Sequence, residues 1–212
     1  VHLILTEEVH VPVWGTYITT PSIHEDFAAV RIETKIKGTE GKKIEIKTKI
    51  VSPDGKIVTE KSDAGAAGQG QPFVQNFLVE SPQLWSPESP ALYLAVSEIY
   101  ADGEIADTYS TRFGIRKIEY ITEKGFFLNG QRRKFKGVCN HHDLGPRGSA
   151  INTAALRHQI SLLKDMGCDA IRTSHNMPAP ELVELCDEMG LMMMIEPFDE
   201  WDVAKCRNGY HR

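Results

Sequence analysis

Residues 137–201 read GVCNHHDLGPRGSAINTAALRHQISLLKDMGCDAIRTSHNMPAPELVELCDEMGLMMMIEPFDEW. Three short apolar runs in this stretch each end in a group of polar or charged side chains, and two segments with helical spacing separate the runs. This order predicts parallel strands joined by helices with right-handed crossovers. In (β/α)8 barrels, side chains at the carboxyl ends of the strands converge on one pocket. We therefore expect the first three βα elements of such a barrel, with a functional site at the strand ends.

The two helical segments carry start and stop signals. Asn152 is a suitable N-cap for the first helix, and Gly167 follows its last apolar position. Pro180 is a good first residue for the second helix, which Gly190 ends. Each glycine leads directly into an apolar run, so the sequence predicts tight connections between helices and strands.

The polar groups after the three runs are Asn140-His141-His142-Asp143, Arg172-Thr173-Ser174-His175 and residues 196–202. A histidine pair with a carboxylate suits metal binding, acid–base work or hydrogen bonding to a polar ligand. An arginine at a strand end can hold a carboxylate through two parallel hydrogen bonds. Carboxylates beside Trp201 suit a sugar, whose apolar ring face stacks on indole while its hydroxyls bond to carboxylates. The three groups together predict one polar binding pocket.

The first part of the chain has a different pattern. Val30, Ile32 and Thr34 alternate with polar or charged residues, and the stretch around Ile44–Ile50 does the same. Period-two alternation indicates strands with one buried face, as in antiparallel sheets. Asp102-Gly103 is a strong hairpin signal. About seven short strands fit this region, so we predict an immunoglobulin-like β-sandwich over residues 1–120. The truncated barrel domain then occupies residues 121–212.

Composition excludes several classes of partner. The net charge of −5 argues against a nucleic-acid partner, because phosphate binding needs a basic face. The chain has no apolar window of about 18 residues, so we expect no membrane span. The four cysteines form no CxxC pair and show no metal-like spacing, and we expect them to be small buried hydrophobes. The cellular compartment, whether periplasmic or cytoplasmic in a bacterium, stays open.

Several strings, in the same order, resemble glycoside hydrolase family 2, and most of all its β-galactosidases. They cover nearly the whole chain: LWSPESPALY at residues 84–93, FGIRK at 113–117, FLNG at 127–130, KGVCNHHD at 136–143, IRTSHNMP at 171–178 and CDEMGL at 186–191. The resemblance implies a retaining enzyme that removes a β-linked galactose from the non-reducing end of a carbohydrate. In this mechanism, two carboxylates about 5 Å apart serve as acid and nucleophile.

The resemblance also implies a role for several residues of this chain. His142 and His175 match family histidines near the sugar, and Arg172 matches an arginine that supports the nucleophile. Asn140 and Asp143 match a polar loop after the first barrel strand. Together with Trp201, these residues are the predicted substrate-binding set. No residue of the chain is assigned as acid or nucleophile, because the family's two catalytic glutamates follow the third barrel strand; we expect the chain alone to be inactive.

The family resemblance implies no required cofactor, although some members bind magnesium. Glu200 aligns with a carboxylate that binds this metal, but the partner position, which is histidine in those members, is Asp202 here. Three parallel strands also leave an unpaired edge and an open face. We expect another copy of the chain to cover that surface, or the second half to be poorly ordered.

Other functions remain open at this level. β-Glucuronidases and β-mannosidases share the same framework. A metal-dependent barrel hydrolase would use His141, His142, His175 and Glu196 as ligands. A non-catalytic binding module would need only the sandwich, but it would leave the polar groups at three strand ends unexplained.

Overall fold

The computed structural model describes residues 3–65, 71–200 and 202–209. Contacts between residues divide the chain into two compact units. The first contains Val1–Trp85, Ala91–Glu119 and Phe127–Gly130, and the second contains Ser86–Pro90, Tyr120–Phe126 and Gln131–Arg212. Two short segments, 86–90 and 127–130, belong by contact to the unit whose main part lies on the other side of residue 120.

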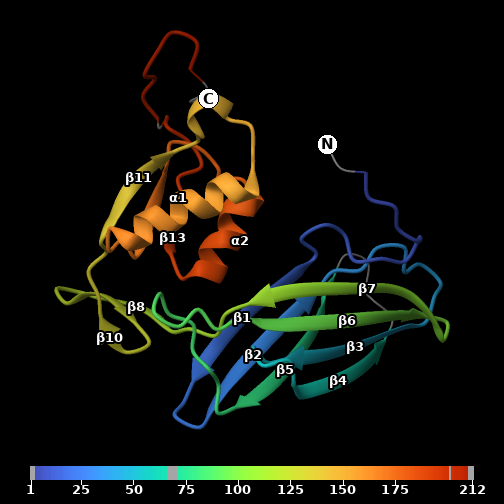
Figure 1. Cartoon of the computed structure of the whole chain (residues 1–212). Helices are drawn as coiled ribbons and strands as arrows, with labels where there is room; N and C mark the ends of the chain where they lie inside the picture. Colours follow the sequence, from blue (N-terminus) through green and yellow to red (C-terminus); the bar gives the residue numbers. More distant parts are fainter. Residues whose placement is uncertain (1–2, 66–70, 201, 210–212) are drawn as a thin grey trace. The chain divides into compact units, whose positions relative to one another are not determined.

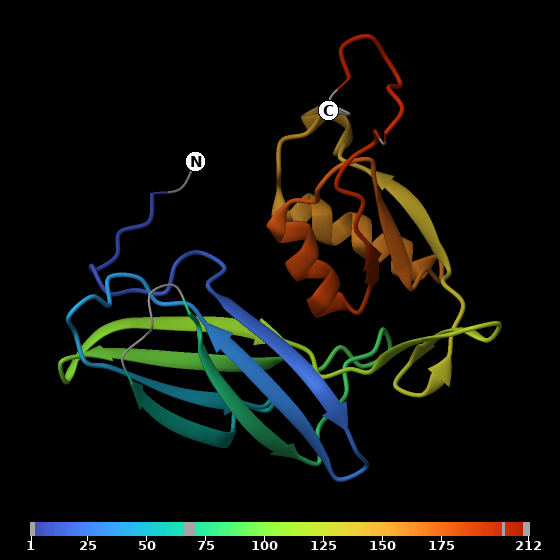
Figure 2. The same cartoon turned by 180° about the vertical axis from the view of Figure 1, so that it is seen from behind.

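The first unit is a sandwich of two antiparallel sheets, as the alternating pattern predicts (Figures 1 and 2). One sheet has the strand order β1-β2-β5, and the other has the order β4-β3-β6-β7. The strands are β1 (Thr16–Ile23), β2 (Phe27–Thr34), β3 (Ile44–Val51), β4 (Ile57–Gly65), β5 (Phe73–Glu80), β6 (Tyr93–Ala101) and β7 (Glu104–Phe113).

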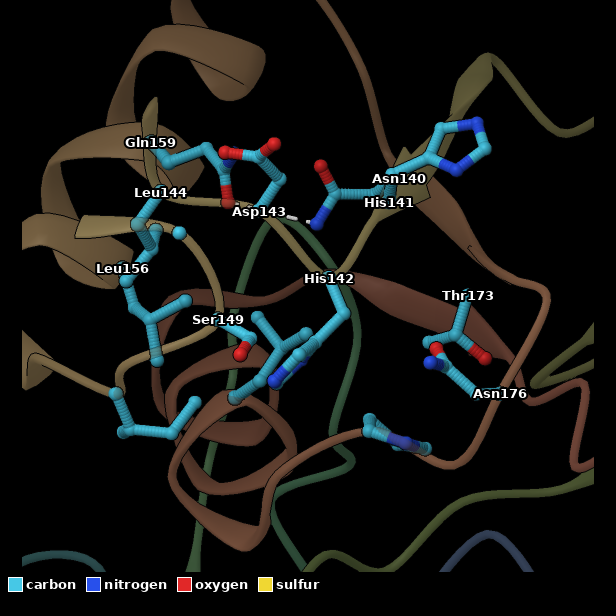
Figure 3. Close-up of a pocket in the computed structure, with 14 residues that line it drawn as sticks. Asn140, His141, His142, Asp143, Leu144, Ser149, Leu156, Gln159, Thr173 and Asn176 are labelled. Atoms are coloured by element: carbon cyan, nitrogen blue, oxygen red, sulfur yellow. Dashed lines mark hydrogen bonds between the residues drawn. The ribbon is translucent and has the colours of Figure 1, made fainter. Parts of the chain in front are cut away.

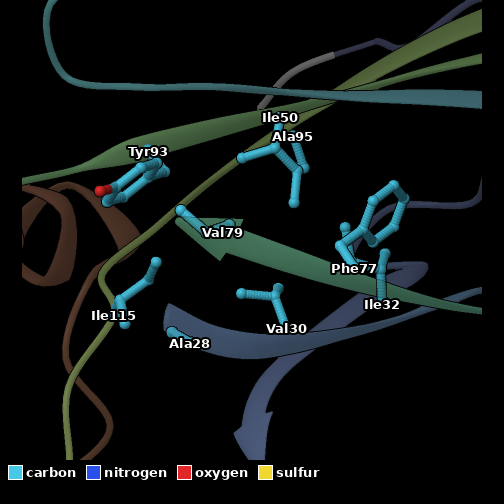
Figure 4. Close-up of a cluster of buried hydrophobic side chains, with 9 residues drawn as sticks. All are labelled: Ala28, Val30, Ile32, Ile50, Phe77, Val79, Tyr93, Ala95 and Ile115. Carbon is cyan, nitrogen blue, oxygen red and sulfur yellow. The ribbon is translucent and has the colours of Figure 1, made fainter. Parts of the chain in front are cut away.

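The core of the sandwich lies between the inward faces of the two sheets (Figure 4). Along β2 and β3, buried side chains alternate with partly buried or exposed ones, because successive residues of a strand point to opposite faces. The hairpin predicted from Asp102-Gly103 is confirmed. These two residues have φ values of 52° and 91° and join β6 to β7. Nine buried residues form the central cluster: Ala28, Val30, Ile32, Ile50, Phe77, Val79, Tyr93, Ala95 and Ile115.

Three short strands follow the sandwich in the chain. They are β8 (Ile118–Ile121), β9 (Gly125–Leu128) and β10 (Gln131–Arg132), and they form a sheet of order β10-β9-β8. Asn129 and Gly130 have φ values of 52° and 76° and make the turn between β9 and β10. This is the hairpin that an Asn-Gly pair predicts.

The second unit is built on three parallel strands, β11 (Gly137–His141), β12 (Ala170–Ser174) and β13 (Met192–Met194), which lie in this order in one sheet. Between β11 and β12 come the 3-10 helix η1 (Gly145–Arg147) and the helix α1 (Thr153–Asp165). The helix α2 (Pro180–Met189) joins β12 to β13. Both α-helices cover the same face of the sheet (Figures 1 and 2). The predicted start of a (β/α)8 barrel is therefore confirmed.

The helix boundaries follow the signals in the sequence. The Asn152 side chain accepts a hydrogen bond from the Ala155 N–H at 2.9 Å, and Pro180 begins α2. Gly190 ends α2 in the left-handed region with φ 72°. Leu156 and Ile160 of α1 are buried against the sheet. Within the part of the chain that the structure describes, none of the helices is both long enough and apolar enough to span a bilayer.

Replacing the N-cap of α1 gives a modest, specific loss of stability. In Asn152→Ala the Ala155 N–H loses its acceptor, and we expect unfolding of the second unit to become easier by about 1 kcal/mol. Urea denaturation followed by helical circular dichroism measures this change. Asn152→Ser is the matched control, because a serine oxygen also caps, and it should lose only a few tenths of a kcal/mol. Equal losses in both variants would contradict the capping role.

Candidate functional site

The register of the second sheet sorts the predicted site residues onto two faces. Val138, Ile171 and Met193 lie side by side on three strands and pack with the helices. One residue further along each strand, Cys139, Arg172 and Met194 lie side by side and point the other way, because side chains alternate between faces. We call the face opposite α1 and α2 the open face. In barrels this is the face that lines the interior.

Arg172 is held on the open face by two neighbouring strands. Its Nη2 lies 2.6 Å from a carboxylate oxygen of Glu196, just after β13. Its Nη1 donates to the Cys139 sulfur on β11 at 3.4 Å. The thiol contact, and to a smaller extent the Glu196 charge, raise the pKa of Arg172 above its ordinary value. The guanidinium is therefore a fixed, permanently charged group at the edge of the predicted pocket.

His141 and His175 face each other at the strand ends. His141 is the last residue of β11 and is opposite Ser174 in the register, and His175 follows β12 directly. Their ring centroids are 5.7 Å apart in an edge-to-face arrangement, and both side chains are exposed. Two imidazoles so placed offer hydrogen-bond donors and acceptors to a ligand that lies over the strand ends.

His142 points elsewhere. Figure 3 shows its ring turned into a hollow toward Ser149, whereas the ring of His141 is turned away. The hollow lies on the helix side of the sheet, since Leu156 and Gln159 of α1 also line it. Its volume of about 20 Å³ is enough for one water molecule but not for a sugar.

Asn140 and Asp143 are also engaged within the protein. The Asn140 amide donates to the Gln159 side chain of α1 at 3.4 Å, on the helix side of the sheet. The Asp143 carboxylate accepts the Gly145 N–H at 2.5 Å and so shapes its own loop. Their predicted contacts with substrate stay a prediction, as does that of His142.

The third polar group, residues 196–202, is held in place by hydrogen bonds of its own loop. The Glu196 N–H donates to the buried Thr173 hydroxyl at 2.9 Å, which links this loop to β12. Glu200 accepts a contact from the Cys206 thiol at 3.8 Å. Trp201, part of the predicted substrate-binding set, lies outside the described residues.

No metal site emerges from these residues. Across 3–65, 71–200 and 202–209, no group of three or more His, Cys, Asp or Glu side chains is arranged to hold an ion. The geometry therefore gives no support to the metal-dependent hydrolase considered above. Glu200 is in no such group among the described residues, and its predicted contact with magnesium stays a prediction.

The expectation that all four cysteines are buried is wrong for two of them. Cys186 is buried in α2, and Cys168 is intermediate, but Cys139 and Cys206 are exposed. Cys139 is exposed because its strand position directs it to the open face, away from the helices. Burial raises the pKa of the Cys186 thiol to about 12, so that thiol is chemically inert.

The predicted substrate-binding set omits His141, Cys139 and Glu196, although His141 and Glu196 are ligands in the metal-dependent alternative. In the structure His141 lies beside His175, and Cys139 and Glu196 contact Arg172. Alternation of side chains along β11 was an available signal. Cys139 and His141 are two residues apart and point to the same face of the strand, whereas His142 points to the opposite face. The pairing between strands was not available, because register is a property of the folded sheet.

Family models match both units of the chain. The description "Glycosyl hydrolases family 2" applies to residues 9–116, and "Glycosyl hydrolases family 2, TIM barrel domain" applies to residues 120–204. The chain belongs to glycosyl hydrolase family 2. The sandwich and the β11–β13 sheet are thus the family's immunoglobulin-like domain and the start of its catalytic barrel.

Individual relatives agree with this family 2 assignment. The β-galactosidase BoGH2A of Bacteroides ovatus is 40% identical over 211 residues, which are 98% of this chain and 25% of that protein. A putative β-glucuronidase of Formosa agariphila is also 40% identical, over 95% of this chain and 19% of its own length. A crystal structure of a β-glycosidase from Bacteroides vulgatus superposes with a TM-score of 0.91 at 33% identity and covers 98% of this chain and 26% of that one. The chain thus spans about a quarter or less of the length of these relatives.

Proposed function

We propose that the second unit is the sugar-holding wall of a retaining β-glycosidase whose substrates are terminal β-galactosides. The observation that carries the proposal is the set of Arg172, His141 and His175 at two adjacent strand ends of a family 2 barrel. The 40% identity to a β-galactosidase supports the choice of sugar. His141 replaces His142 in this proposal, because its ring is on the side of His175.

Each group has a distinct task in the proposed wall. The two imidazoles hydrogen-bond sugar hydroxyls above the strand ends, where donors and acceptors are both needed. Arg172, fixed by Glu196, supplies a positive charge that does not have to reorganise when a negative group approaches. The acid and the nucleophile of a retaining mechanism are two further carboxylates. We assign neither role to any residue of this chain.

A β-glucuronidase is the second candidate, because the equally similar relative from Formosa agariphila bears that description. A glucuronide carries a carboxylate that an unpaired arginine would bind through two parallel hydrogen bonds. Arg172 already has its ion partner in Glu196. The pairing favours a neutral sugar, so β-galactosides rank first.

The proposal is tested by titrating the chain with a sugar and following the NMR signals of its histidine imidazoles. Methyl β-D-galactopyranoside should shift the imidazole signals of His141 and His175 with a dissociation constant on the order of millimolar. The signal of His142, whose ring is turned toward Ser149, serves as the internal control and should stay in place. Methyl β-D-glucuronide should bind more weakly.

Two results would oppose the proposal. Shifts at His142 without shifts at His141 would move the sugar to the helix side of the sheet. Tighter binding of the glucuronide would reverse the ranking of substrates. We also expect no turnover of a chromogenic β-galactoside by the pure chain. Turnover that disappears in Glu196→Gln would place catalysis in the chain itself.

A further inference from the structure

A layer of polar side chains crosses the interior of the sandwich. Four of its residues are at most 2% exposed: Thr34 and Gln75 come from one sheet, and Thr48 and Ser97 come from the other. Two residues away along the chain, each has a residue of the central cluster of Figure 4 on one side and a residue of a second apolar cluster on the other. These flanking residues are Ile32 and Ile36, Phe77 and Phe73, Ile50 and Ile46, and Ala95 and Ile99. The polar layer therefore separates two apolar cores.

The two hydroxyls on one side of the layer bond to each other. Thr48 and Ser97 are opposite each other on β3 and β6, and their hydroxyl oxygens are 2.8 Å apart. One hydroxyl donates and the other accepts, so both side chains have a partner although they are buried. This pair is a reference for the hydroxyls on the other side of the layer.

The Gln75 amide on the other side is bonded through its nitrogen. Gln75 Nε2 donates to a carboxylate oxygen of Asp63 at 3.1 Å and to the Lys61 carbonyl at 3.5 Å, both on β4 of the facing sheet. Both partners are acceptors, so the amide nitrogen must be the atom that points toward β4. Gln75 Oε1 is buried, and none of the described residues donates to it.

Two threonine hydroxyls on adjacent strands are in the same condition. Gln75 is opposite Ile32 of β2, and Thr34 is two residues further along the same face, within reach of a long side chain. Thr16 is opposite Thr34 on β1. Across residues 3–65, 71–200 and 202–209, the buried Oγ1 atoms of Thr16 and Thr34 also have no hydrogen-bond partner. Three such oxygens thus lie on three adjacent strands of one sheet.

The chemistry of these oxygens selects their ligand. An amide oxygen only accepts, so the ligand must be a donor or a cation, whereas a hydroxyl both donates and accepts. A buried cation would need a negative charge beside it. None of the three oxygens is charged, and the Asp63 carboxylate already pairs with Lys61 at 3.4 Å. Water both donates and accepts, and a buried water makes about three hydrogen bonds. Water therefore fits the three oxygens best.

We propose that the polar layer of the sandwich is a binding site for internal water, which donates to Gln75 Oε1 and bonds to the hydroxyls of Thr34 and Thr16. Each of these oxygens then regains the hydrogen bond that it loses when it is removed from solvent. Through Gln75 and Asp63, the bound water extends a hydrogen-bonded path from β1 to β4 of the facing sheet. The site thus links the two sheets through polar contacts between the two apolar cores.

The sign of a stability change tests the proposal. Thr34→Val keeps the shape of the side chain and removes its hydroxyl. The variant should unfold at a lower urea concentration than the original chain, because the water loses a partner in the core. A hydroxyl with no partner would give the opposite sign, since its removal relieves a buried polar group. An unchanged or higher urea midpoint would therefore overturn the proposal.

Two other threonines provide the controls. Thr48→Val should also lower the midpoint, because Ser97 loses its partner at 2.8 Å. Thr108 is exposed on β7, so Thr108→Val measures the effect of the same substitution on a strand without burial. The loss in Thr34→Val should exceed any change in Thr108→Val. A loss no larger than that of the exposed control would count against the water site.

A crystal structure of the unmodified chain tests the site without a variant. Electron density for water should lie within about 3 Å of Gln75 Oε1 and of at least one of the two threonine hydroxyls. A high-resolution map with no density there would overturn the proposal. Anomalous scattering at the same place in crystals grown with rubidium chloride would also overturn it, in favour of a cation. None of these readouts depends on which sugar the second unit binds.

Discussion

Gly190→Ala is expected to destabilise the second unit by about 3 kcal/mol. Gly190 has φ 72°, where a side chain costs energy by itself. A Cβ at this position would also overlap the backbone carbonyl of Pro87. That carbonyl cannot swing aside, because Lys164 Nζ donates to it and to the Gly190 carbonyl, at 3.2 Å in each case.

Hydrogen exchange of the amides in residues 137–195 measures this effect, with urea denaturation as the global readout. Gly167→Ala is the matched control. Gly167 also follows a helix in the left-handed region, with φ 86°, but open space surrounds its Cβ position. This control should lose only about 1 kcal/mol. Similar losses in the two variants would show that the Pro87 contact contributes nothing.

Trp85→Ala is the second large effect, an expected loss of about 4 kcal/mol in the sandwich. Trp85 is 2% exposed, and its truncation leaves a cavity that the strands cannot close. Gly114 packs directly against Trp85, because a Cβ at residue 114 would lie 2.9 Å from the Trp85 Cβ. The Arg116 guanidinium lies 5.0 Å from the centre of the indole ring and loses its aromatic partner in the variant.

Chemical denaturation monitored by β-sheet circular dichroism tests this expectation. Trp14→Ala is the control, since Trp14 is 81% exposed and its removal should change stability by less than about 0.5 kcal/mol. A loss below about 1 kcal/mol in Trp85→Ala would mean that the side chain is not part of the sandwich core. The backbone bonds of Trp85 to Ile115 and Asn129 remain in either variant, so the readout isolates the side chain.

Much of the fold could be predicted from local signals. Alternation around Val30 and Ile46 placed the sandwich strands, and Asn152, Pro180 and Gly190 placed the helix ends. Such signals are reliable because they depend on the period of a strand or helix and on the unpaired backbone groups at helix ends. Segment 86–90 could not be placed in this way, because its contacts with Arg133, Lys164 and Gly190 assign it to the second unit.

The site was predictable in composition but not in arrangement. Alternation along β11 predicts that His141 and His142 point to opposite faces, but it does not say which of them lies beside His175. The folded sheet decides between them, because it pairs His141 with Ser174 and brings its ring to His175. The same holds for Arg172, whose two partners come from β11 and from the loop after β13.

The sequence by itself therefore determined the family, the two kinds of domain and the strand ends at which polar groups gather. These properties are carried by motifs and by periodicity along the chain. The tertiary structure alone decided which side chains from different strands meet on the open face and which strand face the helices cover. The physical reason is that neighbours on a parallel sheet are set by register between strands some 20 to 60 residues apart, as Cys139, Arg172 and Met194 are.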